Sequence, residues 1–189
     1  MNQWEVDCDF ALDSGMVLAV SDSHGRNDNL EKIIKQVSPD LILHMGDSED
    51  YSGWIREMAP CPVVMVRGNC DYGGDMPTEA IVQLGKHRVL LVHGHHHGVR
   101  FDLSHLAEAA LENGCDTALF GHTHEPEVTE IDGVRIYNPG SISLPRQDGH
   151  EPSYIVFDVD ARGEWHAALK YIRREREGAV PKKKWGWFW

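Results

Sequence analysis

Short apolar runs alternate with polar loops along the first two thirds of the chain, and helical periodicity appears between some of them. Residues 29–37 place their apolar side chains on one helix face, which predicts a helix. Two further helices are expected over residues 51–58 and 102–113, and Gly114 is a suitable C-terminal cap for the second. Strands are expected in this part over residues 16–20, 40–44, 62–66, 79–84, 87–92 and 117–120.

The last third of the chain changes to a β pattern. Strands are expected here over residues 127–131, 134–137, 154–159 and 164–172. Asp132-Gly133 marks a turn between the first two of these strands, and Gly85-Lys86 marks an earlier hairpin. Strands alternating with helices, followed by hairpins, indicate an α/β protein in which two packed sheets carry helices on their outer faces.

Length and composition fit one globular domain with appendages. The chain has 189 residues, of which 41% are hydrophobic and 25% charged. We expect a domain over residues 16–175, an aperiodic N-terminal extension over residues 1–15 and a basic, aromatic tail over residues 176–189. Met16 is an alternative start of the protein. Because no apolar run approaches the roughly 18–20 residues that cross a bilayer, and no signal peptide is recognisable, a cytoplasmic protein without a membrane span is expected.

Charge and cysteine content exclude some classes of protein. The formal net charge of −12 disfavours a broad nucleic-acid-binding surface, because such a surface must be basic. The four cysteines are scattered and form no C-x-x-C pair, which favours reduced thiols over disulfides or a structural zinc site. They are Cys8, Cys61, Cys70 and Cys115.

Five short motifs that follow apolar runs carry the candidate chemistry. They are Asp22-Ser23-His24-Gly25, Gly46-Asp47, Gly68-Asn69-Cys70-Asp71, His93-Gly94-His95 and Gly121-His122-Thr123-His124. Loops at the carboxyl ends of strands are where α/β sheets gather ligand groups, and glycine lets the backbone turn sharply there. The inference of a functional site rests on the presence of five such motifs, because a single short histidine motif is usually structural.

These motifs together offer seven candidate metal ligands. They are Asp22, His24, Asp47, Asn69, His95, His122 and His124. Oxygen and nitrogen donors without a thiolate suit transition metals and are too rich in nitrogen for a typical calcium or magnesium site. Seven donors exceed what one tetrahedral site needs, and with a bridging carboxylate they can hold two ions about 3.5–4 Å apart. We therefore expect two divalent ions, manganese first, with iron, nickel, zinc or cobalt as alternatives.

The ordered series D-x-H, GD, GN, GH and GHTH resembles the calcineurin-like metallophosphoesterase superfamily. The fuller set SDSHG, GNCD, HGH, GHTH and NPGS, the last at residues 138–141, is similar to its small YfcE-like phosphodiesterase branch. That branch shares its fold with the retromer scaffold subunit of eukaryotes. The resemblance covers about residues 16–172 and implies a four-layer α/β/β/α sandwich, in which two central sheets are flanked by helices.

The resemblance also implies how the ligands divide between two metals. It places one metal on Asp22, His24 and His124 and the other on Asn69, His95 and His122, and it bridges both with Asp47. A hydroxide bridging the ions would attack the phosphorus of a small phosphate ester. No catalytic residue is assigned beyond that hydroxide.

Cys70 departs from the wider superfamily, in which a histidine at this position can protonate the leaving group. Since a thiol is a poor substitute, we expect Cys70 to be a small residue beside the site and good leaving groups such as aryl alcohols to be favoured. His93 and His96 are candidates for a supporting or proton-donating role. Diesters are favoured over monoesters, because few arginines stand in the motif loops; these are Arg26, Arg67 and Arg146.

Two segments outside the ligand set have expected structural roles. Residues 138–141 are expected to form a rigid turn that supports the histidine loops, rather than a phosphate cradle. The tail carries Trp185, Trp187 and Trp189 at alternate positions, so an extended segment would present them on one side. We expect the tail to dock on this protein or on a second subunit, as in a homo-oligomer, with a disordered end as the alternative.

Two rival functions remain at this point. A non-catalytic, metal-binding scaffold of the same fold would be expected to have lost ligands, whereas all seven positions are intact. A phosphomonoesterase or a nuclease is the second rival. The larger nucleases of this superfamily carry capping domains and basic surfaces, for which a short acidic chain has little room.

Overall fold

The computed structural model of the protein describes residues 10–72 and 76–172. Within this part of the chain, no helix has the length and apolar character needed to cross a membrane. The expectations for the tail over residues 176–189, including its docking in a homo-oligomer, lie outside the described residues, as do Cys8 and the first nine residues of the expected extension.

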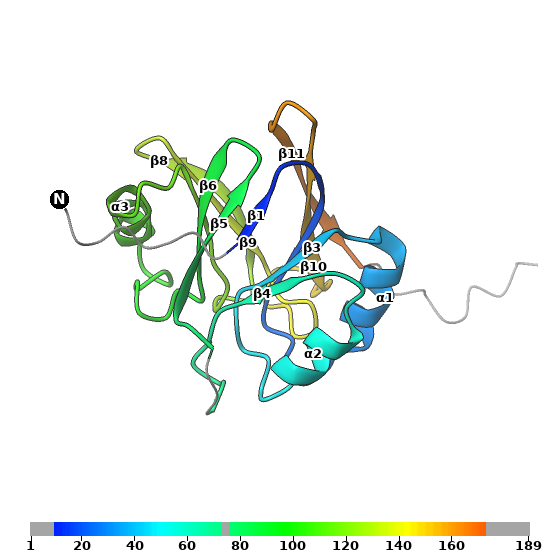
Figure 1. Ribbon diagram of the computed structural model, residues 1–189. Helices are drawn as coiled ribbons and strands as arrows, with labels where there is room; N and C mark the ends of the chain where they lie inside the picture. Colours follow the sequence, from blue (N-terminus) through cyan, green and yellow to red (C-terminus); the bar gives the residue numbers. More distant parts are fainter. Residues whose placement is uncertain (1–9, 73–75, 173–189) are drawn as a thin grey trace, which may run out of the picture.

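Eleven described strands form two sheets, which stand side by side in Figure 1. The six-stranded sheet has the order β1-β5-β6-β7-β9-β8. Its strands are β1 (Phe10–Leu12), β5 (Glu79–Leu84), β6 (His87–Val92), β7 (Thr117–Leu119), β9 (Val134–Pro139) and β8 (Pro126–Ile131). The five-stranded sheet has the order β11-β10-β2-β3-β4, with β11 (Trp165–Tyr171), β10 (Ser153–Val159), β2 (Gly15–Val20), β3 (Leu41–His44) and β4 (Val63–Met65).

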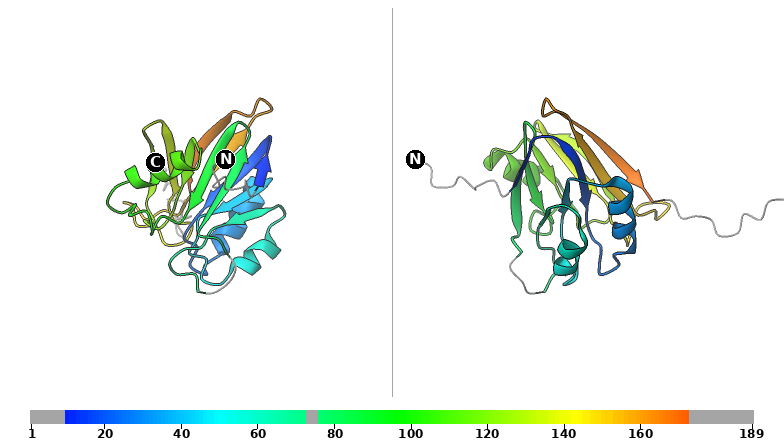
Figure 2. Two further views of the ribbon diagram at one scale, coloured as in Figure 1. Left: turned by 60° about the vertical axis from the view of Figure 1, so that its left-hand side comes forward. Right: turned by 45° about the vertical axis from the view of Figure 1, so that its right-hand side comes forward.

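In the described part of the chain, three helices cover the outer faces of the sheets. Helices α1 (Asp28–Val37) and α2 (Ser52–Met58) lie against the five-stranded sheet, and α3 (Ser104–Glu112) lies against the six-stranded sheet. Figure 2 shows α3 on one side of the molecule and the other two helices on the opposite side. Every helix and strand predicted from the hydrophobic pattern is present, and the four-layer α/β/β/α arrangement is confirmed.

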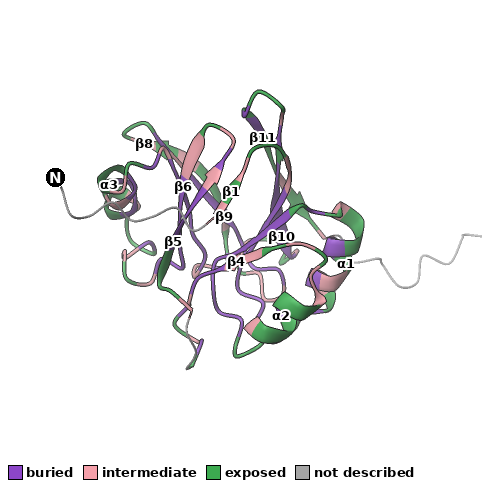
Figure 3. Ribbon diagram, viewed as in Figure 1, coloured by how far each residue is buried: buried purple, intermediate pink, exposed green. Residues whose placement is uncertain are grey.

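Apolar residues fill the three interfaces between these layers. One cluster lies between the sheets and includes Leu43, Leu91 and Phe157, which are fully buried. A second cluster joins α3 to its sheet, and a third joins α1 and α2 to the other sheet. Figure 3 shows the central strands as buried over most of their length, while the helices are exposed on their outer faces. Strands buried on both faces explain the near-continuous apolar runs in the sequence.

Part of the expected N-terminal extension over residues 1–15 is joined to the domain by a strand. Residues 10–12 form β1, which pairs in parallel with β5 at the edge of the six-stranded sheet. Phe10 and Leu12 pack against the core between the sheets. Three residues are too few to show a periodicity, so the hydrophobic pattern gave no signal for this strand.

Candidate metal centre

All five motifs lie in loops that follow strands at one edge of the two sheets. Strands β2, β3 and β4 are parallel neighbours, as are β6 and β7, so the carboxyl ends within each group meet at the same edge. A hydrogen bond joins the two groups directly, because the backbone N–H of His122 donates to Asp22 Oδ2 at 3.1 Å. The sheet topology therefore gathers ligands that are about a hundred residues apart in sequence.

Four of the predicted ligands converge on one point. The ligand atoms of Asp22, His24, Asp47 and His124 all lie within 4.8 Å of one another. The Nε2 atoms of His24 and His124 are 3.1 Å apart, and His124 Nε2 lies 3.3 Å from Asp22 Oδ1. Three of these side chains are buried and the fourth, His24, is partly buried. Two carboxylates and two imidazoles at this spacing form a credible site for one divalent transition-metal ion.

Hydrogen bonds on the far side of each imidazole fix its orientation. His124 Nδ1 lies 2.6 Å from the carbonyl oxygen of Leu144, and His24 Nδ1 lies 2.7 Å from Glu49 Oε1. Since a carbonyl or a carboxylate oxygen accepts, each Nδ1 carries the proton and each Nε2 turns its lone pair to the cluster. This arrangement is the usual support for histidine ligands of a metal.

The remaining predicted ligands lie beside this cluster, around His93. The nitrogen His93 Nε2 lies 3.1 Å from Asn69 Oδ1 and 3.4 Å from Asp47 Oδ2. The His93 ring lies 5.3 Å from the His95 ring and 5.1 Å from the His122 ring, measured between centroids. Asn69, His95 and His122 thus lie around His93, whose ring also approaches Asp47.

The charge states of these groups suit cation binding. Burial lowers the pKa of both His95 and His122 to about 4, and neighbouring His96 and His93 respectively lower it further, so both rings are neutral at pH 7. Burial raises the pKa of Asp47, but hydrogen bonds from His93 and from the backbone N–H of Cys70 outweigh it, and the net pKa lies below its usual value. Neutral imidazole and ionised carboxylate are the forms that coordinate a metal.

Unpaired buried atoms give an independent test of whether a metal fits. Asp22 Oδ1 and His95 Nδ1 are buried and have no hydrogen-bond partner among the described residues. Buried polar atoms without a partner are rare in folded proteins unless a ligand, an ion or water satisfies them. One hydrogen bond competes with a metal: Arg100 Nε donates to His122 Nε2 at 2.9 Å. A neutral imidazole has one lone pair, so His122 can accept from Arg100 or bind a cation, but not both.

Backbone strain is concentrated at the ligands. Five of the seven have a positive φ, and they are Asp22 (53°), His24 (47°), Asp47 (57°), His122 (68°) and His124 (63°). Residues other than glycine rarely adopt this left-handed conformation, and it persists where surrounding contacts hold it, often at functional sites.

Two motif glycines are required because a carboxylate or hydroxyl packs directly against the backbone. A Cβ atom on Gly68 would collide with the carboxylate of Asp47, and one on Gly121 would collide with the hydroxyl of Ser21. These close approaches explain the glycine before Asn69 and the glycine before His122.

Asp71 is the supporting residue that the sequence reasoning missed. Its carboxylate accepts hydrogen bonds from the backbone N–H groups of Asp47, Ser48, Glu49 and Gly68 at 2.7–2.9 Å, and from the Ser48 hydroxyl at 2.9 Å. It therefore joins the G-D loop to the G-N loop. The sequence signal for this role was the position of Asp71, an acidic residue at the end of the motif Gly68-Asn69-Cys70-Asp71.

The turn at residues 138–141 supports the histidine loops, as predicted. Asn138 Nδ2 donates to the carbonyl oxygen of Gly121 and to the Thr123 hydroxyl, both at 3.0 Å. The Ser141 hydroxyl donates to the carbonyl oxygen of Asp22 at 2.7 Å. The turn thus holds the first and last motif loops at a fixed separation.

Comparison with known proteins finds relatives of this chain. The family described as "Calcineurin-like phosphoesterase superfamily domain" matches residues 16–162. The probable metallophosphoesterase YsnB of Bacillus subtilis is 40% identical over 146 residues, which cover 76% of this chain and 84% of that protein. The phosphodiesterase YfcE of Escherichia coli is 35% identical over 107 residues, which cover 52% of this chain and 53% of that protein.

Solved structures show the same fold. A predicted phosphoesterase from Streptococcus pneumoniae has a TM-score of 0.69 and 25% identity, with 85% of this chain and 99% of that chain covered. Vacuolar protein sorting 29 from Cryptosporidium parvum has a TM-score of 0.65 and 22% identity, with 86% and 100% covered. Given the family match and the relative at 40% identity, the chain belongs to the calcineurin-like phosphoesterase superfamily.

Proposed function

We propose that the protein is a metal-dependent phosphodiesterase that uses two divalent ions, manganese first among the candidates. The observation that carries this proposal is the buried convergence of Asp22, His24, Asp47 and His124 within 4.8 Å. Asn69, His95 and His122 would hold a second ion, and Asp47 would be shared by both sets of ligands. The similarity to a relative named as a phosphodiesterase supports the choice of diesters.

Two bound ions would supply a nucleophile at neutral pH, by lowering the pKa of a water between them, and would neutralise charge on the phosphoryl oxygens. The side chains of the chain hold this arrangement. Glu49 and the Leu144 carbonyl aim His24 and His124 at one ion, while Asp71 fixes the backbone on either side of Asp47.

The leaving group receives little help from Cys70. Burial raises the pKa of this thiol to about 11, with the nearby Asp47 carboxylate adding to the effect. His93 is also unsuited to donate a proton, because its Nδ1 lies 2.6 Å from the Met45 carbonyl and its Nε2 faces Asn69 and Asp47. His93 is therefore a positioning residue. His96 packs against His95 with ring centroids 3.9 Å apart and ring planes tilted by 41°, and it is exposed, so it remains the candidate donor.

Metal-dependent hydrolysis of chromogenic esters tests the proposal. The protein, stripped of metal and reloaded with manganese, should hydrolyse bis(p-nitrophenyl) phosphate faster than p-nitrophenyl phosphate. Asp47→Asn should lower kcat by about 100-fold or more, because it removes the charge shared by both ligand sets. The exposed Glu130→Lys on β8 serves as a control for folding and assay.

The scaffold alternative makes the opposite prediction. A scaffold would bind manganese with the same ligands and stay inert towards every activated ester. Metal binding without turnover, in a protein with a cooperative thermal transition, would therefore refute the proposed function and leave the metal centre intact. Equal rates on the monoester and the diester would refute only the preference for diesters.

A further inference from the structure

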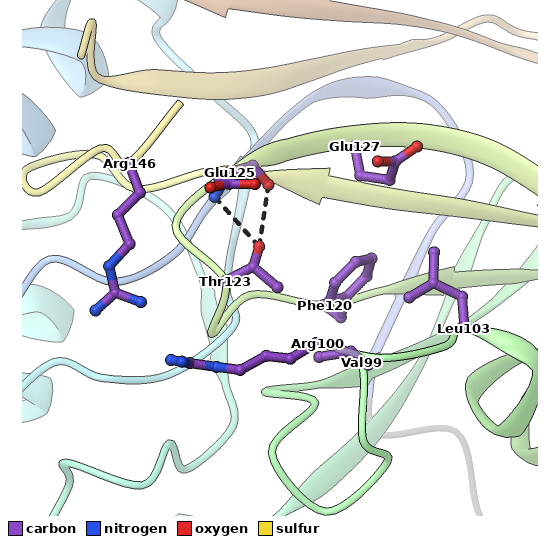
Figure 4. Close-up of a pocket in the computed structure, with 8 residues that line it drawn as sticks. All are labelled: Val99, Arg100, Leu103, Phe120, Thr123, Glu125, Glu127 and Arg146. Atoms are coloured by element: carbon purple, nitrogen blue, oxygen red, sulfur yellow. Dashed lines mark hydrogen bonds between the residues drawn. The ribbon is translucent and has the colours of Figure 1, made fainter. Parts of the chain in front are cut away.

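A cleft of about 360 Å³ opens beside the histidine loops. Figure 4 shows the side chains that line it, which come from the loop between β6 and α3, the loop after β7, the first residues around β8 and the loop after β9. They are Val99, Arg100, Leu103, Phe120, Thr123, Glu125, Glu127 and Arg146. This volume is at the lower end of the range for sites that bind small organic molecules.

Hydrogen bonds attach one end of the cleft to the metal centre. Arg100 Nε lies 2.9 Å from His122 Nε2, and the backbone N–H of Arg146 donates to the carbonyl oxygen of His124 at 3.1 Å. Both arginine side chains belong to exposed residues, and Figure 4 shows their guanidinium groups at the same end of the cleft. Guanidinium groups present planar sets of N–H donors that match phosphate oxygens. This end of the cleft is therefore suited to bind a phosphate group that lies between the two arginines and the candidate metal centre.

The middle and the far end of the cleft have a different character. Val99, Phe120 and Leu103 line the middle of the cleft with apolar side chains, and Leu103 is the most exposed of the three. An aromatic ring can pack on an apolar wall of this kind. Glu127 lies at the far end with Leu103, away from the arginines in Figure 4, and it is exposed. The cleft thus runs from two arginines, beside which the exposed Glu125 also lies, across apolar side chains to the carboxylate of Glu127.

We propose that this cleft binds the organic substituent of the phosphate ester and selects a ring whose outer end is cationic or uncharged over one whose outer end is anionic. The inference rests on the proposed function of the metal centre and names its substrate class. Arg100 and Arg146 hold the phosphate oxygens, Phe120 and Val99 face the ring, and Glu127 attracts a positive group and repels a negative one. A second phosphate or a carboxylate at the outer end is disfavoured.

A series of non-hydrolysable phosphonates tests the proposal by direct binding. Isothermal titration of the manganese-loaded protein compares 4-(aminomethyl)benzylphosphonate, benzylphosphonate, 4-carboxybenzylphosphonate and methylphosphonate. The aminomethyl compound should bind about ten-fold more tightly than the carboxy compound, because one charge is attracted and the other repelled by exposed carboxylates. Benzylphosphonate should bind about ten-fold more tightly than methylphosphonate, because only the former buries a ring.

Two charge-reversal variants on β8 distinguish binding in the cleft from an effect of the net charge of the protein. Glu127→Lys should reverse the preference between the aminomethyl and carboxy compounds. Glu130→Lys changes the net charge equally on the same strand, but Glu130 does not line the cleft and lies on the opposite face by strand alternation. It should leave the preference unchanged. The same two variants and the wild type are also assayed with bis(p-nitrophenyl) phosphate.

Each outcome decides one of the two proposals. Charge-dependent binding that reverses only in Glu127→Lys supports the cleft. Equal affinities across the series, or the same change in both variants, overturn it even when the ester is hydrolysed. Selective binding without hydrolysis of any ester supports the cleft as a binding site and overturns the proposed hydrolytic function.

Discussion

Asp71 offers the sharpest test of how the two central loops are held together. Its carboxylate accepts four backbone N–H groups and one hydroxyl, all at 2.7–2.9 Å, and its side chain is almost completely buried. The substitution Asp71→Asn keeps the shape but replaces one acceptor oxygen by an NH₂ group. That group would then face backbone donors and leave at least two of them unpaired.

The expected loss can be worked from these contacts. A buried donor left without its partner costs about 1–3 kcal/mol, and hydrogen bonds to a charged acceptor are at the stronger end of the range. For two unpaired donors and a lost charge we expect Asp71→Asn to lower the free energy of unfolding by about 3 kcal/mol. For a chain of this size that corresponds to a fall in Tm of about 10 °C.

Thermal unfolding followed by circular dichroism measures this change, with Asp50→Asn as the matched control. Asp50 is exposed in the loop between β3 and α2, part of whose backbone Asp71 holds by hydrogen bonds, and it already has a positive φ of 66°, which asparagine tolerates. The control should change the free energy of unfolding by no more than about 0.5 kcal/mol. If the two variants unfold within about 1 kcal/mol of each other, the hydrogen bonds of Asp71 do not stabilise the loops and the reasoning is wrong.

Three further predictions follow from the site. Gly121→Ala should destabilise the protein by about 2 kcal/mol in urea unfolding, because its Cβ would collide with a buried hydroxyl; a stability equal to the wild type would contradict this. His44 is fully buried, and burial lowers its pKa to about 4. Between about pH 6.5 and 4 the unfolded chain therefore binds more protons at His44 than the folded protein does, so the stability of the fold should decrease as the pH falls through that window. His44→Gln should reduce this slope, and an unchanged slope would exclude His44 as its source. Arg100→Ala should strengthen manganese binding at His122 in calorimetric titration, because a competing hydrogen bond is removed, and weaker binding would argue against that competition.

The candidate site was predictable because its ligands stand in short, ordered motifs. All seven predicted ligands lie in loops at one edge of the sheets, and four of them form the buried cluster. Membership of the calcineurin-like superfamily, inferred from the same motifs, is confirmed. The division of ligands between two ions and the identity of the metal stay predictions.

The arginine count shows where a reading by motif fails. Arg100 stands outside the motif segments and was not considered among the cations near the site, yet it lies 2.9 Å from His122. The site therefore has one more arginine nearby than the motif loops indicated, and the preference for diesters rests on the similarity to a relative named as a phosphodiesterase. Four residues separate Arg100 from His95, and the path of this loop is set by packing rather than by any local pattern.

The amino-acid sequence alone determined the order and type of the elements, because apolar periodicity is a local property that burial imposes on each helix and strand. It also determined the identity of the ligands, since their chemistry is carried by residue type. Tertiary structure alone decided the parallel pairing of β1 with β5, the hydrogen bonds of Asp71 across some twenty residues, and the approach of Arg100 to His122. Each of these contacts depends on distances between segments that meet only after the sheets have packed. Such distances produce no periodic pattern in the sequence.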